Sequence, residues 1–370
     1  MTRPALRIAV DARELAPHPT GVGRYLLELL QAWVRDPDAA DCEVTLLAPA
    51  SLDVSGPAWH GPGARVTSVP ILGLDGTAWE QLRLPLAILG RADVLFAPGY
   101  SAPAFSPVPT VVTVHDVSFF AHPEWFGRRE GRRRRWTCRV AAANAARLLT
   151  VSEFSKREMV RWLGVRPERV VVTPHGVTQF APAAAPSGVD RPPLVLFVGT
   201  QLNRRHLPDL VRAFAPLAGT DPRARLVLVG ANRSHPHEDA RETARDLGIA
   251  DAVQSRPWIR DDELAGLYRA ATAFAWLSSY EGFGLPPLEA MAAGVPVVAY
   301  DTPVAREVYG TAADLVPIGD VDGVTAALTA LAIDPARRAA RRDAGRRLAG
   351  GYVWDRPARA TLRVLREAAS

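Results

Sequence analysis

The chain has 370 residues, of which 48% are hydrophobic and 22% charged, so it has the composition of a soluble globular protein and the length of two ordinary domains. No apolar run is as long as a membrane-spanning helix, and residues 1–4 lead into a predicted strand rather than a signal peptide, so we expect a cytoplasmic protein. The two cysteines, Cys42 and Cys138, lie far apart without metal-ligand spacing, which argues against a disulfide framework or a metal site.

The first half of the chain alternates short apolar runs with helical patterns. This alternation predicts an α/β domain with a doubly wound parallel sheet. The predicted strands are residues 6–11, 43–48, 65–69, 94–97, 110–115, 148–151 and 169–173.

Two glycines, Gly21 and Gly23, stand between the first predicted strand and an amphipathic helix that starts at Tyr25. A glycine loop in this position suits the close approach of a phosphate or a sugar. Its spacing differs from the dinucleotide-binding fingerprint, and a plain tight turn explains the glycines equally well.

The fifth predicted strand ends in two polar residues, His115 and Asp116. Ligands bind at the carboxyl ends of strands in open α/β sheets, so His115 is a candidate site residue. A structural role for a lone histidine is the alternative, and Asp116 has the simpler role of orienting its neighbours.

A strongly basic run follows, from Arg128 to Trp136, on a predicted helix that reaches about residue 147. A solvated charged face explains this run most simply. Nucleic acid is unsupported because no recognised binding motif accompanies the arginines. Contact with anionic lipid headgroups or with a lipid-diphosphate acceptor is the third interpretation.

Residues 179–193 have linker composition, and an apolar run at residues 194–199 restarts the α/β pattern. We therefore predict a first domain over residues 1–178, the linker, a second domain over residues 194–352 and a terminal helix over residues 353–370. Two such domains face a cleft, where small ligands bind.

The most informative stretch is EGFGLPPLE, residues 281–289, which follows a buried apolar run and begins a short helix. Prolines suit the first helical turn, and the free amides around them lie at the positive end of the helix, which favours phosphate. Carboxylates do not bind phosphate, so Glu281 and Glu289 are predicted to accept hydroxyl groups attached to it. A nucleotide-sugar presents such hydroxyls on both sides of its diphosphate. The alternative is a purely structural role, in which the glycines form a turn and the acids complement the helix dipole.

This stretch, with AMAAGVPVVA after it, resembles the donor site of family-four retaining glycosyltransferases of the GT-B fold. TGVGRY, TVHD, VSEFSK and GTQLNRRHL resemble other motifs of the same family, so the resemblance covers nearly the whole chain. It implies two Rossmann-like domains and a C-terminal helix that crosses back to the first.

The resemblance also implies roles for individual residues. Glu281 faces the donor sugar, Glu289 binds the ribose, and His115 contacts the sugar or the developing charge. The backbone that holds the diphosphate is formed by Gly282, Phe283, Gly284 and Leu285.

Three further pairs follow from the resemblance. Gly21 and Gly23 face the phosphates and the acceptor, and Trp258 and Ile259 edge the nucleotide base. Arg204 and Arg205 neutralise the leaving diphosphate, although Arg205 stands where the family has lysine. His206 and His175 replace asparagines of the family pattern, and we assign His175 no catalytic role.

The favoured hypothesis is a retaining, metal-independent hexosyltransferase that uses a nucleoside diphosphate sugar and needs no cofactor. GDP-mannose is the first candidate donor. The acceptor is a saccharide or lipid-linked saccharide of cell-surface polysaccharide or glycoconjugate synthesis, which would place the enzyme at the inner face of the membrane. A GT-B nucleotide-sugar epimerase and a non-catalytic nucleotide- or carbohydrate-binding protein are the alternatives.

Overall fold

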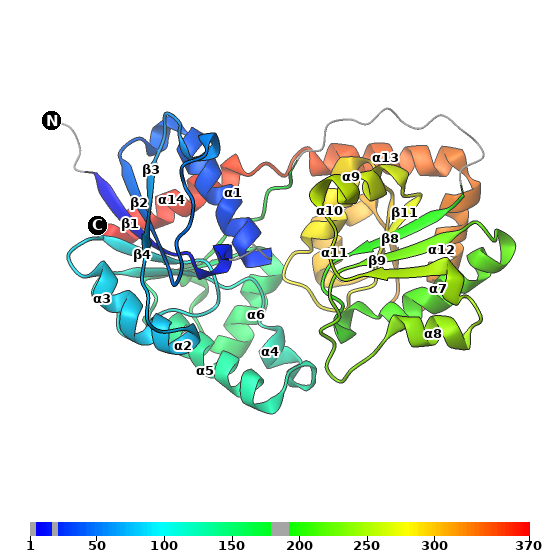
Figure 1. Cartoon of the computed structure of the whole chain (residues 1–370), viewed down its shortest axis with the longest axis horizontal. Helices are drawn as coiled ribbons and strands as arrows, with labels where there is room; N and C mark the ends of the chain where they lie inside the picture. Colours follow the sequence, from blue (N-terminus) through cyan, green and yellow to red (C-terminus); the bar gives the residue numbers. More distant parts are fainter. Residues whose placement is uncertain (1–4, 17–20, 179–191) are drawn as a thin grey trace. The chain divides into compact units, whose positions relative to one another are not determined.

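The computed structural model describes residues 5–16, 21–178 and 192–370, so most of the predicted linker lies outside the described residues. The chain divides into two compact units (Figure 1). The first unit comprises Met1–Ala121, Arg128–Gly176 and Val353–Ser370, and the second comprises His122–Gly127 and Val177–Tyr352. The short segment His122–Gly127 thus groups with the second unit, although it lies inside the predicted first domain.

The first unit contains a seven-stranded sheet in the order β3-β2-β1-β4-β5-β6-β7, and every pairing is parallel. Its strands are β1 Leu6–Asp11, β2 Cys42–Ala48, β3 Arg65–Pro70, β4 Val94–Ala97, β5 Thr110–Thr113, β6 Arg147–Thr150 and β7 Val170–Val172. These strands confirm the predicted doubly wound sheet. The direction of winding reverses between β1 and β4. In open α/β sheets, ligands bind at the carboxyl ends of the strands at such a point.

Helices cover both faces of this sheet. They are α1 Gly21–Arg35, α2 Gly76–Ala78, the π-helical turn η4 Trp79–Arg83, α3 Leu84–Ile88, α4 Ser118–Ala121, α5 Arg128–Asn144, α6 Glu153–Leu163 and α14 Asp355–Ala369. Because side chains alternate along a strand, Ile8 and Val10 of β1 pack in one core with α1 and α14. Ala9 packs in the opposite core with Trp79, Leu84 and other residues of α2–α3.

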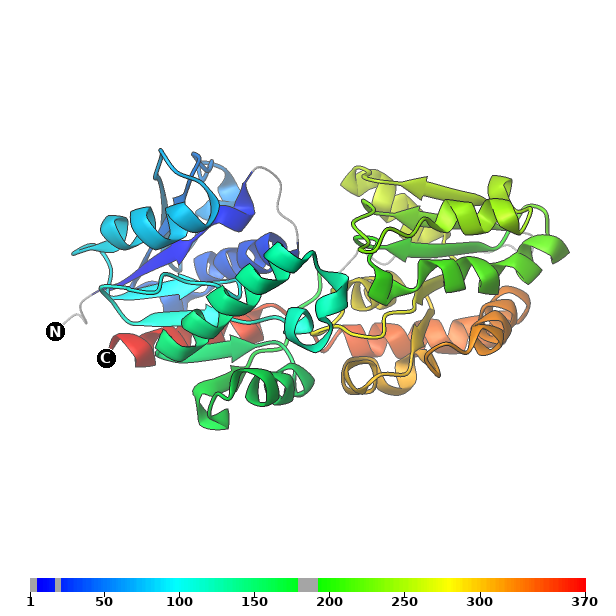
Figure 2. The same ribbon diagram turned by 90° about the horizontal axis from the view of Figure 1, so that it is seen from below.

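The terminal helix α14 belongs to the first unit, as predicted. It lies beside α1, and both views show it along the sheet (Figures 1 and 2). Its buried face includes Leu362 and Leu365. The Trp33 indole N–H donates to the Ala358 carbonyl over 2.8 Å, which ties α1 to α14.

The second unit contains a six-stranded parallel sheet in the order β10-β9-β8-β11-β12-β13. Its strands are β8 Leu194–Val198, β9 Arg225–Val229, β10 Val253–Arg256, β11 Ala273–Trp276, β12 Val297–Tyr300 and β13 Asp314–Val316. Its helices are α7 Leu207–Thr220, α8 Ala240–Asp246, α9 Asp261–Ala270, α10 Leu285–Ala293, α11 Pro303–Val308, α12 Val321–Ile333 and α13 Pro335–Ala349. Here the winding reverses between β8 and β11.

Candidate functional site

The candidate site lies where the second sheet changes its direction of winding. The loop after β8 carries Arg204 and Arg205, and the loop after β11 carries Glu281 and the glycines. Because β8 and β11 are neighbouring parallel strands, their carboxyl ends bring these two loops together. The sequence motifs around residues 204 and 281 therefore form one site.

The turn into α10 is shaped by Gly284, which has a left-handed backbone with φ of 88°. A Cβ atom at this position would lie 1.8 Å from the Tyr309 hydroxyl oxygen, so only glycine fits. That hydroxyl donates toward the carbonyls of Gly284 at 2.9 Å and Phe283 at 3.2 Å. Burial, with Glu281 adding to it, raises the pKa of Tyr309 well above its usual value, so the phenol stays a donor. Tyr309 thereby fixes the loop whose amides precede α10.

Helix α10 begins at Leu285, with Gly284 as its N-cap and prolines in its first turn. The amides that helical bonding leaves available are therefore those of Gly284, Leu285 and the residues before them. Glu289 is the fifth helical residue and belongs to the second turn. Its buried carboxylate lies 3.5 Å from the Tyr268 hydroxyl of α9.

Two guanidinium groups converge on Glu281. Arg205 Nε donates to Glu281 Oε1 over 3.0 Å, and Arg204 Nη2 donates to Oε2 over 3.4 Å. The Ser278 hydroxyl donates to Oε1 over 3.0 Å. All three charged side chains are largely buried, so they interact more strongly than an ion pair in bulk water. The cluster carries two positive charges and one negative charge.

Arg205 is held from three sides. Its guanidinium lies over the Trp276 ring, 4.3 Å from the centroid, and its Nη1 donates to the Thr200 carbonyl over 2.5 Å. Gly199 leaves room for this arrangement, because a Cβ there would lie 2.8 Å from Arg205 Nη1. A planar guanidinium can stack and donate at its edge simultaneously, which an ammonium group cannot do. This geometry explains how arginine fits where the family pattern has lysine.

The two loops are also joined through His206 and Ser279. The Ser279 amide donates to the Arg204 carbonyl over 2.8 Å, and the His206 ring Nε2 lies 3.0 Å from the Ser279 hydroxyl. His206 has a left-handed backbone with φ of 45°, a conformation that asparagine and histidine adopt more readily than most residues. This backbone requirement accounts for histidine at the family's asparagine position.

The predicted base-binding pair lies in the segment between β10 and α9. Trp258 is exposed, Ile259 is half-buried, and both precede α9. Arg260 is the N-cap of α9 and makes no side-chain capping bond, and Asp261 and Asp262 lie in the first turn of the helix. There their charges complement the helix dipole.

In the first unit, Gly21 and Gly23 form the beginning of α1 and do not lie in a loop, while residues 17–20 lie outside the described residues. The space beside Gly21 is open. One turn further along the helix, the Tyr25 ring packs edge-on against His115, with centroids 4.8 Å apart. His115 Nε2 lies 2.9 Å from the Pro98 carbonyl, so the ring stands at the end of β4 as well as β5.

His175 stacks on His115 with ring centroids 5.3 Å apart. Burial lowers the pKa of His115, and burial with the neighbouring His115 lowers the pKa of His175 well below its usual value. In the unfolded chain each histidine has a pKa of about 6.5. In the folded unit both pKa values are lower, so folding disfavours the protonated forms. The contribution of these histidines to the free energy of unfolding of this unit is therefore complete above pH 6.5 and is lost as the pH falls below it.

We predict that lowering the pH from 7.5 to 5.5 destabilises the first unit by up to about 1.4 kcal/mol for each of these two histidines. The His175→Asn variant should lose less stability over this interval than the wild type. Hydrogen exchange of α14 peptides measures the opening of this unit separately from the second. His60→Asn, at an exposed position, controls for loss of a histidine, and an unchanged pH dependence in His175→Asn would contradict the assignment.

The described residues contain no group of three or more histidine, cysteine, aspartate or glutamate side chains placed to hold a metal ion.

Comparison with protein families identifies the chain. The model described as "Glycosyltransferase Family 4" matches residues 19–179, and the model described as "Glycosyl transferases group 1" matches residues 183–348. The chain belongs to the group 1 glycosyltransferases. The first match includes every strand of the first sheet except β1, and the second includes all six strands of the second sheet.

Curated relatives of this glycosyltransferase match part of their length. The O-antigen chain mannosyltransferase B of Escherichia coli is 30% identical over 226 residues, which are 58% of this chain and 59% of the relative. The D-inositol 3-phosphate glycosyltransferase of Kineococcus radiotolerans is 37% identical over 251 residues, which are 60% of this chain and 58% of the relative. The chain thus spans about three fifths of the length of the relatives it matches.

Solved structures share the GT-B fold over almost the whole chain. A sucrose-phosphate synthase from Thermosynechococcus elongatus has a TM-score of 0.76 at 21% identity and covers 99% of this chain and all of that chain. The Anabaena protein Alr3699/HepE, solved with UDP and glucose, has a TM-score of 0.71 at 18% identity over 98% of this chain and all of that chain.

The sequence patterns miss three residues that organise the site of this glycosyltransferase. Trp276, Ser278 and Tyr309 support Arg205, Glu281 and the glycine turn, respectively. Trp276 and Ser278 stand next to the recognised motif, but Tyr309 lies far from it in sequence. Only the fold brings its hydroxyl to Gly284.

Proposed function

We propose that this glycosyltransferase is a retaining, metal-independent hexosyltransferase that uses a nucleoside diphosphate sugar, with mannose from GDP-mannose as the first candidate. Its acceptor is a saccharide or a lipid-linked saccharide of cell-surface polysaccharide or glycoconjugate synthesis. The enzyme works at the cytoplasmic face of the membrane. The observation that carries the proposal is the convergence of Arg204 and Arg205 beside the N-terminus of α10.

This arrangement supplies positive charge where the nucleoside diphosphate would gain negative charge as its bond to the sugar breaks. Two guanidinium groups donate in planar forks, and the amides before Leu285 point from the positive end of a helix. Such fixed donors stabilise a leaving group without reorganisation, which is often the largest single catalytic contribution. They supply the charge that a divalent cation would otherwise bring, which supports metal independence.

The carboxylates complete the proposed donor site. Glu281 aligns the two arginines and faces the sugar hydroxyls, while Glu289 accepts the ribose hydroxyls. In the proposed front-face reaction, the acceptor oxygen forms a bond to the anomeric carbon as the bond to the diphosphate breaks. The departing phosphate oxygen takes the acceptor's proton, and the anomeric configuration is retained.

Support for mannose comes from the E. coli relative, which is described as an O-antigen chain mannosyltransferase. That description also supports a cell-surface glycan as the product. His115 would contact the donor sugar, and Trp258 and Ile259 would edge the base. The basic helix α5, with Arg128–Trp136, supports contact with an anionic membrane that carries the acceptor.

We predict that GDP raises the melting temperature of the protein more than UDP, dTDP or ADP, and that a chelator leaves this shift unchanged. Differential scanning fluorimetry with each nucleotide, with and without EDTA, measures it. A larger shift with UDP, dTDP or ADP would contradict GDP-mannose as the donor and would identify the base of the donor nucleotide instead. A shift that EDTA abolishes would contradict metal independence, and no shift with any nucleotide would contradict the donor site.

Turnover then separates the proposal from its alternatives. The favoured enzyme transfers the sugar to an acceptor with its anomeric configuration retained, which proton NMR of the product shows. A non-catalytic binding protein would show the thermal shift without turnover. An epimerase would convert the nucleotide-sugar without an acceptor.

A further inference from the structure

A cavity of about 640 Å³ opens in the first unit, at the edge of the sheet where β1, β2 and β3 end. Its walls come from the segments that follow these strands and from α1. The volume is typical of sites that hold a small molecule, which span roughly 300–1,000 Å³. The carboxyl ends of parallel strands are also where ligands bind in open α/β sheets. None of the residues assigned to the donor site lines this cavity, so the proposed donor does not account for it.

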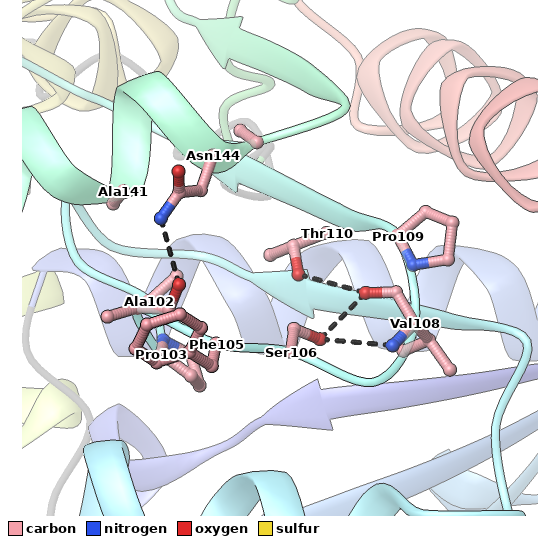
Figure 3. Close-up of a pocket in the computed structure, with 11 residues that line it drawn as sticks. Ala102, Pro103, Phe105, Ser106, Val108, Pro109, Thr110, Ala141 and Asn144 are labelled. Carbon is pink, nitrogen blue, oxygen red and sulfur yellow. Dashed lines mark hydrogen bonds between the residues drawn. The ribbon is translucent and has the colours of Figure 1, made fainter.

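A second pocket of the first unit is a weaker candidate for a binding site. It lies between residues 102–110 and α5, and its volume of about 220 Å³ is below that range (Figure 3). Its polar groups bond to the protein itself. The Ser106 hydroxyl donates to the Val108 carbonyl over 2.7 Å, and the Asn144 side chain donates to the Ala104 carbonyl over 2.8 Å. These bonds hold the loop in place and leave the larger cavity as the better candidate.

A network of buried charges supports one wall of the larger cavity. Asp11, at the end of β1, and Glu80, in η4, are 3% and 2% exposed. Arg13 donates from Nε to Asp11 Oδ1 over 3.0 Å and from Nη2 to Asp11 Oδ2 and Glu80 Oε1, each over 2.7 Å. The Ser101 hydroxyl donates to the same Glu80 oxygen over 2.6 Å. The Arg13 guanidinium also lies over the Trp79 ring, 5.4 Å from its centroid.

This network prepares Arg13 to contact a ligand. A guanidinium has five N–H donors. Asp11 and Glu80 take three of them, the Gly76 carbonyl takes a fourth over 3.4 Å, and the fifth has no partner among the described residues. Burying charged groups has a large desolvation cost, and the donor site uses none of these three. Turns of π-helix such as η4 are also frequent at functional sites. The network therefore fixes Arg13 at the cavity wall with one donor left for a ligand.

The apolar part of the wall is formed by Leu15, Leu52 and Trp59. All three are partly buried and pack against the core of the unit, so the wall exists without a ligand. The Trp59 amide donates to the Gly56 carbonyl over 3.0 Å, which fixes the turn that carries the indole. Ligand sites typically combine such aromatic and aliphatic surface with a few polar groups. A pyranose ring matches this surface, because one of its faces presents C–H groups and its rim presents hydroxyls.

The charges at the cavity favour a neutral ligand. Asp53 and Asp75 are exposed at its rim. Asp53 Oδ1 accepts from the Ser55 amide over 2.9 Å and from the Ser55 hydroxyl over 2.6 Å, which orients the carboxylate. Asp75 is the N-cap of α2, but its side chain makes no capping bond. Arg13 is the one cation among the described residues that line the cavity, and two carboxylates already neutralise it. A phosphate would therefore be repelled, whereas hydroxyl groups can donate to both aspartates.

Helix α1 separates this cavity from the surroundings of His115. Tyr25 packs edge-on against His115, whereas Leu27 lines the cavity. Two positions along a helix correspond to about 200° around its axis, so these side chains lie on opposite sides of α1. Because His115 is proposed to contact the donor sugar, a ligand in the cavity lies away from the sugar that reacts.

We propose that this cavity, defined by Arg13, Trp59, Asp53 and Asp75, is a subsite for a neutral sugar unit of the acceptor other than the unit that receives the transferred sugar. The sugar ring packs on Trp59, its hydroxyls donate to the aspartates, and one of its oxygens accepts from Arg13. The proposal rests on the proposed function and deepens it, because it requires an acceptor of at least two sugar units without a phosphate at this position.

Saturation-transfer NMR of the full chain, without any nucleotide, tests binding. The probes are mannobiose, lactose and N,N′-diacetylchitobiose, which are neutral disaccharides of different sugars. At least one of them should bind, and the 1-phosphate of that disaccharide should bind at least tenfold more weakly. Binding of none of the three, or equal binding of the phosphorylated form, would overturn the proposal.

Variants place the bound disaccharide in the cavity. Trp59→Ala should weaken its binding at least tenfold, as should Asp53→Asn combined with Asp75→Asn. Ala50→Phe fills the cavity from an exposed position on its wall, so it should also abolish binding and should fold even if Trp59→Ala does not. Unchanged binding in Ala50→Phe would overturn the proposal.

Two matched controls lie in the same unit, outside the cavity. Trp162→Ala removes a half-buried tryptophan of α6, and Asp38→Asn removes an exposed carboxylate just before β2, at the opposite edge of the sheet. Both variants should bind the disaccharide as the wild type does. A loss in either control equal to that of the cavity variants would overturn the proposal.

Kinetics separate this proposal from the proposed function. Ala50→Phe should raise the KM for the disaccharide as acceptor at least tenfold, while kcat and the thermal shift with GDP stay unchanged. Transfer with a wild-type KM in this variant would overturn the subsite and leave the glycosyltransferase reaction in place. If no transfer occurs but the disaccharide binds as described, the proposed reaction fails and the saccharide site stands.

Discussion

Replacing Arg205 by alanine should lower kcat by about 10²–10³-fold, the range seen when one fixed donor to a developing oxyanion is removed. Arg205 stacks on Trp276, donates to Glu281 and is pinned to the Thr200 carbonyl, so its charge is already in position before reaction. Its loss leaves the leaving diphosphate with the charge of Arg204 and the helix amides. Initial rates of sugar transfer at saturating donor measure the effect, and circular dichroism checks the fold.

Arg205→Lys and Arg212→Ala are the matched controls for this substitution. Lysine keeps the charge but loses the planar stack and the fork, so its kcat should lie between wild type and alanine. Arg212, an exposed arginine on α7, pairs with Asp209 and should tolerate alanine with near-wild-type kcat. Wild-type kcat in Arg205→Ala would remove the arginine from the proposed mechanism.

Most of the fold follows from local pattern. Apolar runs such as residues 194–198 and 273–276 are short and continuous, as expected of strands buried on both faces, and the structure places parallel strands at both. The order of the strands is not a local property. It places β8 beside β11 and thereby decides that the Arg204 loop meets the Glu281 loop.

The residues that sequence patterns miss depend on this non-local order. The apolar run around Trp276 indicates only a buried strand. In the structure the Arg205 guanidinium stacks on the Trp276 ring, because Gly199 has no side chain to occupy that space. Tyr309 has no motif of its own, and its contact with Gly284 links residues 25 positions apart. A pattern within one segment holds no information about such contacts.

The glycines near the first strand show that glycine in a sequence does not always indicate a loop. Gly21 and Gly23 indicate a loop because glycine is common in turns, but both lie in the first turn of α1. The following residues, with buried Tyr25, Leu26 and Leu29, have the apolar spacing of a helix that packs on the sheet. Tertiary packing of that face outweighs the modest helix penalty of glycine.

Replacing Glu281 by alanine should abolish measurable transfer while leaving the affinity for GDP unchanged or higher. The carboxylate neutralises one of the two guanidinium charges that converge on it, so its removal makes the cluster more positive toward a diphosphate. The same removal frees both arginines from their alignment and deletes the proposed contact with the sugar. Transfer should therefore be lost without any loss of affinity for GDP.

Isothermal titration with GDP and a transfer assay on the same preparation measure the two effects. Glu289→Ala is the matched control, since this carboxylate lies on α10 beside Tyr268 and is proposed to hold the ribose; it should weaken GDP binding. Glu281→Gln keeps an acceptor for the arginines but not the charge, and separates alignment from electrostatics. Near-wild-type transfer in Glu281→Ala would exclude Glu281 from the site, whereas weaker GDP binding would show that it holds the nucleotide rather than the sugar.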